Sequence, residues 1–153
     1  MSAKLMSLTY RPLTADDSEF CVRVHHLAMR EYVEPLWGWD EAAQDAWALD
    51  FLKHRDATHE IVLIDGRPIG YISYQQTSDG LLLHKLYLHP DYHNKGFGSQ
   101  ILRRMIRLGD SVSTPVQLSV LTTNHRAQSF YERHGFIMVD TTAEKVRMRR
   151  ATI

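Results

Sequence analysis

The stretch LLLHKLYLHPDYHNKGFGSQIL, residues 81–102, predicts a strand, then a loop with two glycines, then an amphipathic helix. Its apolar beginning is typical of a buried strand, which Pro90 ends. Gly96 and Gly98 stand at the start of the helix, where unbonded backbone amides and the helix dipole favour an anion such as a phosphate. A single G-x-G is weak support, because a tight turn also needs glycine. The stretch lacks the six-residue dinucleotide fingerprint, and Lys95 precedes the glycines, so neither a Rossmann nor a P-loop site is indicated.

On both sides of this stretch, short apolar segments alternate with turn residues. Asp65-Gly66 between two apolar runs indicates a hairpin, and Ser78-Asp79-Gly80 indicates another turn. Strands are expected at 6–11, 61–64, 69–74, 81–88, 116–121, 136–139 and 146–148. Helices are expected from Thr14 to about Arg30, from Asp40 onward, after Gly98, and from Asn124 to Arg133. Since no repeat or linker separates these elements, we expect one α+β domain over residues 1–153, with a mostly antiparallel, twisted sheet of six to seven strands flanked by about four helices.

Helical spacing predicts which side chains of the middle helices face the core. In the second helix the apolar stripe consists of Ala43, Trp47 and Phe51. In the third helix the inward residues are Ile101, Leu102, Met105 and Leu108.

The charged residues divide between the two halves of the chain. The 153 residues carry 18 basic and 18 acidic side chains, so the formal net charge is zero. Residues 1–80 hold 13 acids and 7 bases, a net of −6, and residues 81–153 hold 5 acids and 11 bases, a net of +6. The acids are densest from Glu31 to Glu60. Such an asymmetry suggests two kinds of partner, although any single charge is usually just a solvated surface group.

Composition and segment lengths exclude several classes of protein. With 44% hydrophobic and 24% charged residues, the chain is globular rather than disordered. Apolar stretches such as Ile61–Ile64 are too short to span a membrane, and Met1-Ser2-Ala3-Lys4 begins no apolar signal core, so we expect no membrane partner and a cytoplasmic location. The single cysteine, Cys21, excludes an internal disulfide, and its apolar helical pattern predicts a buried residue rather than a nucleophile. Zero net charge gives no support for nucleic-acid binding.

A second informative stretch, NHRAQSFYERHGF, spans residues 124–136. Residues 81–102 resemble the acetyl-CoA signature of the Gcn5-related N-acetyltransferase (GNAT) family, in which a strand L-x-V-x-P leads into Q/R-x-x-G-x-G/A and a helix. Residues 124–136 resemble the family's later element N-x-x-A-x-x-F-Y-x-x-x-G-F, and the order of elements matches over nearly the whole chain. The resemblance implies the GNAT fold, with the sheet splayed at the cofactor site, and an enzyme that moves an acetyl group from acetyl-CoA (coenzyme A) to an amine.

The resemblance also implies cofactor-binding roles. The pyrophosphate loop would comprise His93, Asn94, Lys95, Gly96, Phe97, Gly98 and Ser99, and it would bind mainly through the amides from Asn94 to Ser99. Leu86 and Leu88 would pair their backbone with the pantetheine arm, which Asn124 would also contact. His93 departs from the family's Gln or Arg, which would make binding weaker or more pH-dependent. Positive charge from Lys95 and from Arg103, Arg104 and Arg107 is expected near the phosphates.

Two further residues would act on the thioester. The Leu86 amide would polarise its carbonyl group. Tyr131 matches the tyrosine that protonates the departing CoA thiolate in the family. Without the motif, Tyr131 would instead be interpreted as an aromatic residue packed beside Phe130.

The general base is left open by the resemblance. Many relatives carry Glu on the strand before the loop, at the position of Leu82. His84 lies two residues on, on the same face by alternation, and is similar to the strand histidine of arylalkylamine N-acetyltransferases, so it is the first candidate. The alternative for His84 is a core histidine bonded to the backbone. Glu34, Asp40 and Glu41 are the other candidate bases, and Lys85 is expected on the opposite face of the strand.

The acceptor site is expected in the segment EYVEPLWGWDE, residues 31–41, because the first two helices and their connector wall this site in the family. Tyr32, Glu34, Trp37, Trp39 and Asp40 would form an apolar, acidic mouth for a protonated amine. Alternatively, Trp37 and Trp39 simply pack the two helices together. The Trp-Gly-Trp-Asp connector resembles that of poorly characterised bacterial members of the family.

Three hypotheses of function follow. The first is transfer of acetyl to a small-molecule amine. The second is an N-terminal or lysine protein acetyltransferase, which needs an open groove for a peptide. The third is a non-catalytic acyl-CoA-binding module. We expect a monomer or homodimer and no metal site, because Pro90 breaks the helix that an i, i+4 pair of His89 and His93 would need.

Overall fold

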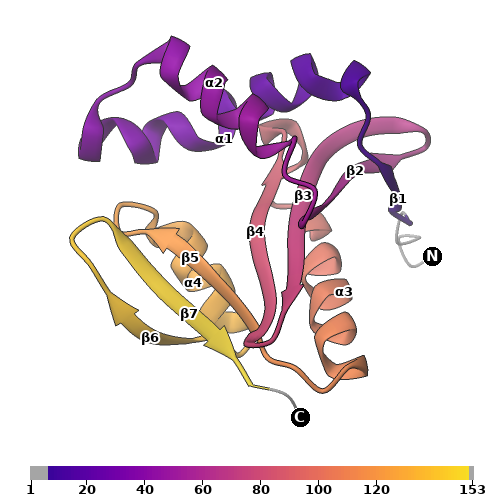
Figure 1. Ribbon diagram of the computed structural model, residues 1–153, viewed down its shortest axis with the longest axis vertical. Coiled ribbons are helices and arrows are strands. Elements are labelled where there is room, and N and C mark those ends of the chain that lie inside the picture. Colours follow the sequence, from indigo (N-terminus) through magenta and orange to yellow (C-terminus); the bar gives the residue numbers. More distant parts are fainter. Residues whose placement is uncertain (1–6, 152–153) are drawn as a thin grey trace.

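The computed structural model describes residues 7–151, which form one seven-stranded sheet with helices on both faces (Figure 1). The sheet order is β1-β2-β3-β4-β5-β7-β6, and every neighbouring pair is antiparallel except β4 and β5. The strands are β1 (Thr9–Pro12), β2 (Thr58–Ile64), β3 (Arg67–Thr77), β4 (Gly80–Leu88), β5 (Val116–Leu121), β6 (Ile137–Thr141) and β7 (Lys145–Arg150). Met6, the expected start of the first strand, lies outside the described residues.

The helices form a layer on each side of the sheet. They are α1 (Ser18–Trp37), α2 (Glu41–Phe51), α3 (Phe97–Ser111) and α4 (His125–Arg133), with short 3-10 turns η1 (Ala15–Asp17) and η2 (Pro90–Tyr92). α1 and α2 lie against one face, and α3 and α4 lie against the other (Figure 1). The expected α+β class, with a mostly antiparallel sheet, is confirmed.

Strand alternation divides the core into two clusters. Ile61, Leu63 and Tyr71 face α1, where Cys21 and Val24 are fully buried. Burial raises the pKa of the Cys21 thiol to about 12, so the expectation of a buried, unreactive cysteine is confirmed. The opposite face of the sheet packs against α3 through Val62, Ile72, Leu81, Leu83, Ile101, Leu102 and Met105.

Helix α1 is longer than the sequence indicated. The expected end near Arg30 is wrong, because the helix continues to Trp37, where the Gly38 amide bonds to the Glu34 carbonyl oxygen at 2.9 Å. Pro35 lies in the last turn, where its missing amide removes a single hydrogen bond. An ion pair between Arg30 and Glu34, 2.9 Å apart, spans the same turn and supports it. The expected connector over residues 32–40 therefore shrinks to residues 38–40.

Helix α2 begins as expected but faces the core differently. The Asp40 carboxylate accepts a hydrogen bond from the Ala43 amide at 3.0 Å and caps the helix. The expected stripe through Trp47 is wrong, since Trp47 is 64% exposed and Gln44 and Ala48 are buried instead. Gln44 turns inward because its side-chain oxygen bonds to His25 Nε2 of α1 at 2.8 Å.

Helix α3 buries Ile101, Leu102 and Met105 as expected. Leu108, also expected to point inward, is 37% exposed, and Gly109 faces β5 in its place. A Cβ atom on Gly109 would stand 3.0 Å from the Thr114 carbonyl oxygen. The helix therefore lies so close to the backbone before β5 that a larger residue at 109 would require its neighbours to shift by a few tenths of an ångström.

Strands β4 and β5 pair only at one end. Their parallel ladder joins Leu81 to Val116 and Leu82 to Gln117 and stops there. Beyond these pairs the strands diverge toward α1 and α4 (Figure 1). The edges that face each other across the divergence carry no ladder hydrogen bonds, so their backbone groups are available to another partner.

Neither a membrane-spanning helix nor a metal cluster occurs in residues 7–151. No helix there combines the length and the apolar character needed to cross a membrane. No three His, Cys, Asp or Glu side chains within that range are placed to hold a metal ion. His89 accepts a hydrogen bond from the Asp91 amide at 3.1 Å, and His93 bonds to the Leu88 carbonyl oxygen at 2.8 Å, so both rings are used within the loop.

Candidate active site

A cleft of about 940 Å³ opens where β4 and β5 diverge. Its walls come from β4, β5, α1, the loop before α3, α4 and β7. Both stretches that the sequence singled out, residues 81–102 and 124–136, contribute to these walls. They therefore meet at one site, although more than 20 residues separate them in the chain.

The loop before α3 presents a row of free backbone amides. Within residues 7–151, none of the six amides from Asn94 to Ser99 donates a hydrogen bond to a protein acceptor. Asn94, with φ of 60°, and Gly96, with φ of 84°, curl the loop through left-handed conformations. Gly96 begins α3 without a capping side chain. Six unbonded donors at the positive end of a helix fit a pyrophosphate group.

The side chains of this loop differ in where they point. Asn94, Gly96, Gly98 and Ser99 line the cleft, whereas Lys95 and Phe97 do not, and Phe97 is 7% exposed and belongs to the core. His93 Nε2 donates to the Leu88 carbonyl oxygen at 2.8 Å. The imidazole therefore ties the loop to the end of β4, instead of facing a phosphate as the motif suggested.

The expected arginine cluster is not at the loop. Arg103, Arg104 and Arg107 do not line the cleft, and Arg104 pairs with Glu60 at 3.0 Å. Arg126 of α4 takes their place, since it lines the cleft and donates to the Asn94 side-chain oxygen at 2.8 Å.

The hydrogen-bond pattern of β4 orients Leu86 and Leu88 toward the gap. The His89 amide donates to the Ile69 carbonyl oxygen of β3 at 2.8 Å, and Tyr87 lies opposite Tyr71 in the same register. Because pairing alternates along an antiparallel ladder, residues 87 and 89 bond to β3, and Leu86 and Leu88 direct their amides and carbonyls toward β5. The Leu86 amide is therefore directed into the cleft, while the Leu88 carbonyl is the one that His93 holds.

Tyr131 and Asn124 reach the cleft from α4. The Tyr131 ring packs between Phe130 and Phe136, with ring centroids 5.2 and 5.6 Å away. In the described part of the chain its hydroxyl has no hydrogen-bond partner. Burial, and secondarily the nearby Tyr87, raises the pKa of Tyr131, so the hydroxyl stays protonated and can donate. Asn124 caps α4 by accepting from the Ala127 amide at 3.0 Å.

A β-bulge in β4 changes the direction of two side chains. In the pairing with β3, Ser73 lies opposite Lys85 and Tyr74 lies opposite Leu83, so His84 is the extra residue. A bulge breaks the alternation of side chains. His84 and Lys85 consequently both approach Phe51 of α2, and the expectation that Lys85 lies on the opposite face from His84 is wrong.

His84 has the features of a proton acceptor. Its Nε2 bonds to the Gln75 side-chain oxygen at 3.0 Å, so this nitrogen carries the proton and Nδ1 is left as an acceptor. Burial lowers the pKa of His84, and the charges of His59, His54 and Lys85 lower it further. The ring lines the cleft and is bonded to a side chain, so the alternative of a core histidine bonded to the backbone does not describe it.

Lys85 is the main cleft residue that sequence reasoning missed. Its ammonium lies over the ring of Phe51, 4.7 Å from the centroid, with the rings of Tyr87 and Tyr71 at 5.7 and 6.0 Å. Burial lowers the pKa of Lys85 to about 8. Only the bulge brings it to this face, and nothing in the alternating pattern of residues 81–88 signals a bulge.

The model of the acetyltransferase (GNAT) family matches residues 21–136. This chain belongs to the GNAT acetyltransferase family. An uncharacterized N-acetyltransferase of Methanocaldococcus jannaschii is 24% identical over an alignment of 141 residues, and the match covers 86% of this chain and 62% of that protein. Another, of Mycobacterium tuberculosis, is 36% identical over 74 residues, which are 47% of each chain. The chain thus spans less than two thirds of the length of either relative.

The fold is shared with a solved structure. The crystal structure of PaiA N-acetyltransferase from Thermoplasma acidophilum in complex with coenzyme A has a TM-score of 0.77 at 21% identity, over 95% of this chain and 99% of that one.

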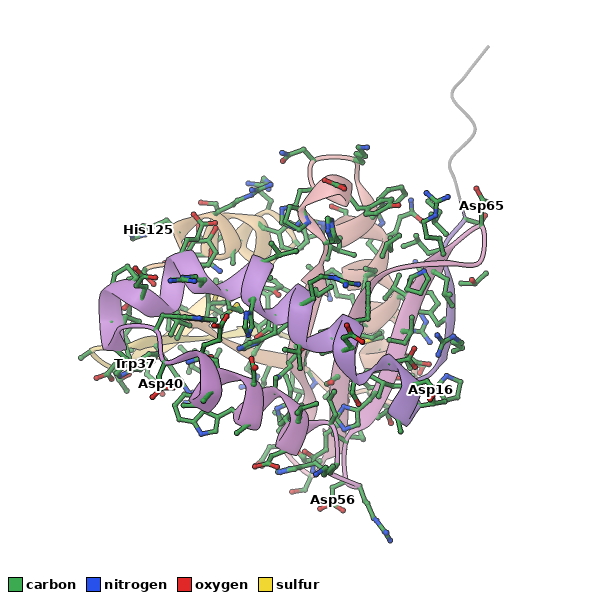
Figure 2. All side chains as sticks on the ribbon, turned by 90° about the horizontal axis from the view of Figure 1, so that it is seen from above. Asp16, Trp37, Asp40, Asp56, Asp65 and His125 are labelled. Atoms are coloured by element: carbon green, nitrogen blue, oxygen red, sulfur yellow. The ribbon has the colours of Figure 1, made fainter. Side chains whose placement is uncertain are left out.

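The acceptor side of this GNAT cleft departs from expectation. Tyr32 lines the cleft, and its carbonyl oxygen accepts a hydrogen bond from Thr123 Oγ1 at 2.6 Å, which ties α1 to the turn before α4. The other four expected acceptor residues do not line it. Trp37 and Asp40 lie at the outer turn between α1 and α2 (Figure 2). The reason is the length of α1, which carries these residues past the cleft.

Three of those four residues, Glu34, Trp39 and Asp40, make contacts within the helical pair instead. Glu34 pairs with Arg30, and Asp40 caps α2. Trp39 packs against His25 and His26, with ring centroids 6.1 and 5.2 Å apart, and Trp37 is 55% exposed. The alternative that Trp39 packs the helices together is the one the geometry supports. The acidic, aromatic mouth is not formed, and Glu34, Asp40 and Glu41 are too far along the helical pair to line the site.

Proposed function

We propose that this protein is an acetyl-CoA-dependent N-acetyltransferase that transfers acetyl to the primary amine of a small molecule by direct attack on the thioester. The observation that carries the proposal is the convergence on one cleft of the free amides of residues 94–99, the gap-facing Leu86 amide and the unpartnered Tyr131 hydroxyl. Acetyl-CoA supplies an acetyl thioester and an anionic pyrophosphate. The amides match the pyrophosphate, and the other two groups match the two charges that develop as acetyl moves.

Each residue has one task in this mechanism. The Leu86 amide donates to the carbonyl oxygen that becomes negative as the amine attacks. His84 Nδ1 takes the proton that the amine nitrogen loses when the new C–N bond forms. Tyr131 gives its hydroxyl proton to the sulfur as the C–S bond breaks. Neutral His84 and protonated Tyr131 are the forms that their environments favour near neutral pH.

The position of α1 along one wall of the cleft supports a small acceptor over a peptide. α1 passes over the site, and the hydrogen bond from Thr123 to Tyr32 joins it to the far side of the gap. An extended peptide needs an open groove between these elements. The available hydroxyl of Tyr131 likewise supports a catalytic role over a module that only binds acyl-CoA.

Replacing Tyr131 by Phe tests the proposal. This change removes one hydroxyl and keeps the ring between Phe130 and Phe136. With an acceptor identified by a thiol-release screen of amines and peptides, Tyr131→Phe should lower kcat by about 100-fold, since general acid catalysis contributes this order of magnitude. The dissociation constant of CoA, measured by calorimetry, should stay within about twofold of wild type.

Tyr74→Phe is the matched control, because the Tyr74 hydroxyl bonds to Glu60 at 3.0 Å and does not line the cleft. It should leave kcat unchanged. Equal turnover by Tyr131→Phe and wild type would remove Tyr131 from the mechanism. Acetylation of peptides alone in the screen would overturn the assignment of a small acceptor.

A further inference from the structure

We propose that the acceptor is an amine with a carboxylate one carbon away, as in an α-amino acid, and that Lys85 binds this carboxylate. The inference rests on the proposed acetyltransferase function and adds the chemical class of the acceptor. It follows from the position of an unpaired cation beside the candidate base, and from the charge of the surrounding wall.

The Lys85 ammonium has no anionic partner in residues 7–151. It makes neither an ion pair nor a hydrogen bond there, although its side chain is mostly buried against Phe51, Tyr71 and Tyr87. A buried charge without a counterion is costly, and a carboxylate from a ligand would offset that cost. The lowered pKa of Lys85, about 8, is consistent with this missing partner and leaves the ammonium mostly charged at neutral pH.

No protein carboxylate is available to compete for Lys85. The titratable groups around it are Cys21 and His25 from α1, His59 from β2, Tyr71 from β3, and His84 and Tyr87 from β4. All of these are neutral or cationic near neutral pH. Phe51 is the centre of this group, since the rings of His54, His59 and His84 lie 5.3 to 5.4 Å from its own ring.

The bulge sets the spacing between the two ligand groups. Consecutive side chains of a strand normally point to opposite faces. Because His84 is the extra residue of the bulge, the side chains of His84 and Lys85 lie on the same face. Since both side chains contact Phe51, a carboxylate bound by Lys85 and an amine that gives its proton to His84 can belong to one small molecule. An α-amino acid is such a molecule, because a single carbon joins its amine and carboxylate.

The rest of the acceptor wall is also cationic. Lys145 and Arg147 of β7 line the cleft beside Ser119 of β5, and Glu31 is the only acidic residue among the described lining residues. Arg147 is already paired with Asp140. A polyamine would meet net repulsion here, whereas an anionic group would be attracted.

Matched acceptor pairs test the inference. The probes are the common amino acids and, for each, the amine that remains when the carboxylate is absent, such as tyrosine and tyramine or phenylalanine and phenylethylamine. Wild type should show a kcat/KM at least about tenfold higher for the carboxylated member, since a hydrogen bond to a charged group contributes this much or more.

Lys85→Met should raise KM for the carboxylated member by about 10- to 100-fold, with little change in kcat or in the constants for the decarboxylated member. Methionine keeps the apolar contact with Phe51 and removes only the charge. Lys85→Arg should restore much of the preference. Lys53→Met, which removes an exposed lysine outside the cleft, should behave as wild type.

The outcomes separate the inference from the proposed function. Acetylation of decarboxylated amines at equal or higher efficiency would overturn the inference and leave acetyl transfer standing. An equal loss of kcat by Lys85→Met with the carboxylated and the decarboxylated acceptor of a pair would also overturn the inference, because Lys85 would then act in the chemistry with any acceptor. Absence of transfer to every probe, by a protein that binds CoA, would count against the proposed function itself.

Discussion

His84 illustrates how one hydrogen bond can prepare a base. Gln75 on the adjacent strand fixes which ring nitrogen is protonated, and the free Nδ1 is then available to an incoming amine. Burial comes first among the causes that lower the pKa of His84, and the positive charges around it act in the same direction. The imidazole is therefore neutral, and able to accept a proton, at lower pH than an ordinary histidine.

This position leads to a prediction about pH. Because neutral His84 is the active form and its pKa is lowered, the acidic limb of kcat, measured at saturating acceptor so that ionisation of the free amine does not set the profile, should have its midpoint below about pH 6.5, the ordinary imidazole pKa. His84→Gln should remove this acidic limb and reduce the plateau rate by about 100-fold. The measurement is a pH–rate profile with one acceptor.

His54→Gln is the control, because His54 also packs on Phe51 but its ring does not line the cleft. It should retain the acidic limb. An acidic limb of unchanged midpoint in His84→Gln would assign the proton transfer to another group.

Single residues differed in how well the sequence predicted them. Asn124 and Tyr131 lie in the cleft as their motif implied, because a helix with a defined N-cap fixes which residues share its face. Lys85 could not be placed, because one extra residue in the strand reverses every side chain that follows it. The role expected for the His93 side chain also differs, since the Leu88 carbonyl points away from β3, has no ladder partner and takes its hydrogen bond from His93.

At the scale of elements, β4 has two unlike edges. On one side it pairs with β3 along its length, and on the other it pairs with β5 through only two residues. The backbone groups of Leu86 and Leu88 therefore face the cleft while those of Tyr87 bond to β3. This arrangement makes the strand itself a binding surface.

Amide hydrogen exchange followed by NMR, with and without CoA, can test the two edges. The Leu86 amide and the amides of residues 94–99 should exchange quickly in the free protein and become at least about tenfold slower with CoA, because binding gives them acceptors. The Tyr87 amide should be protected in both states. Protection of Tyr87 that depends on CoA, with no change at Leu86, would contradict the assigned register.

Most elements follow from local sequence patterns. The hairpin about Asp65-Gly66, β5 and α4 all lie close to their expected residues. The end of α1 and the inward face of α2 do not. Past Arg30, α1 is tied to the turn before α4 by the bond from Thr123 Oγ1 to the Tyr32 carbonyl oxygen, and the inward face of α2 is set by the bond between His25 and Gln44. Periodicity alone contains no information about such partners.

At the scale of the whole molecule, the division of charge has a different meaning from the one the sequence suggested. The basic second half does supply the loop, the helices and the cationic wall of the cleft. Several acids of the first half are used within the protein, as Glu34 with Arg30, Asp45 with His26 and Glu60 with Arg104. The cleft is therefore cationic on both its cofactor and its acceptor side.

Calorimetric titration of CoA into two glycine variants tests the central claim most directly, namely that this cleft binds the cofactor through the loop before α3. Gly96 and Gly66 both have positive φ, 84° and 76°, and no atom lies within 4 Å of a Cβ added at either position. Aspartate should therefore strain both backbones by a similar amount, about 1 kcal/mol. Asp65, next to Gly66, lies across the molecule from His125 at the start of α4 (Figure 2).

Gly96→Asp places a carboxylate at the amides that would hold the pyrophosphate, so it should weaken CoA binding by about 100-fold or more through charge repulsion. Gly66→Asp should bind CoA with the wild-type dissociation constant. Undiminished binding by Gly96→Asp, or equal weakening in both variants, would contradict the account.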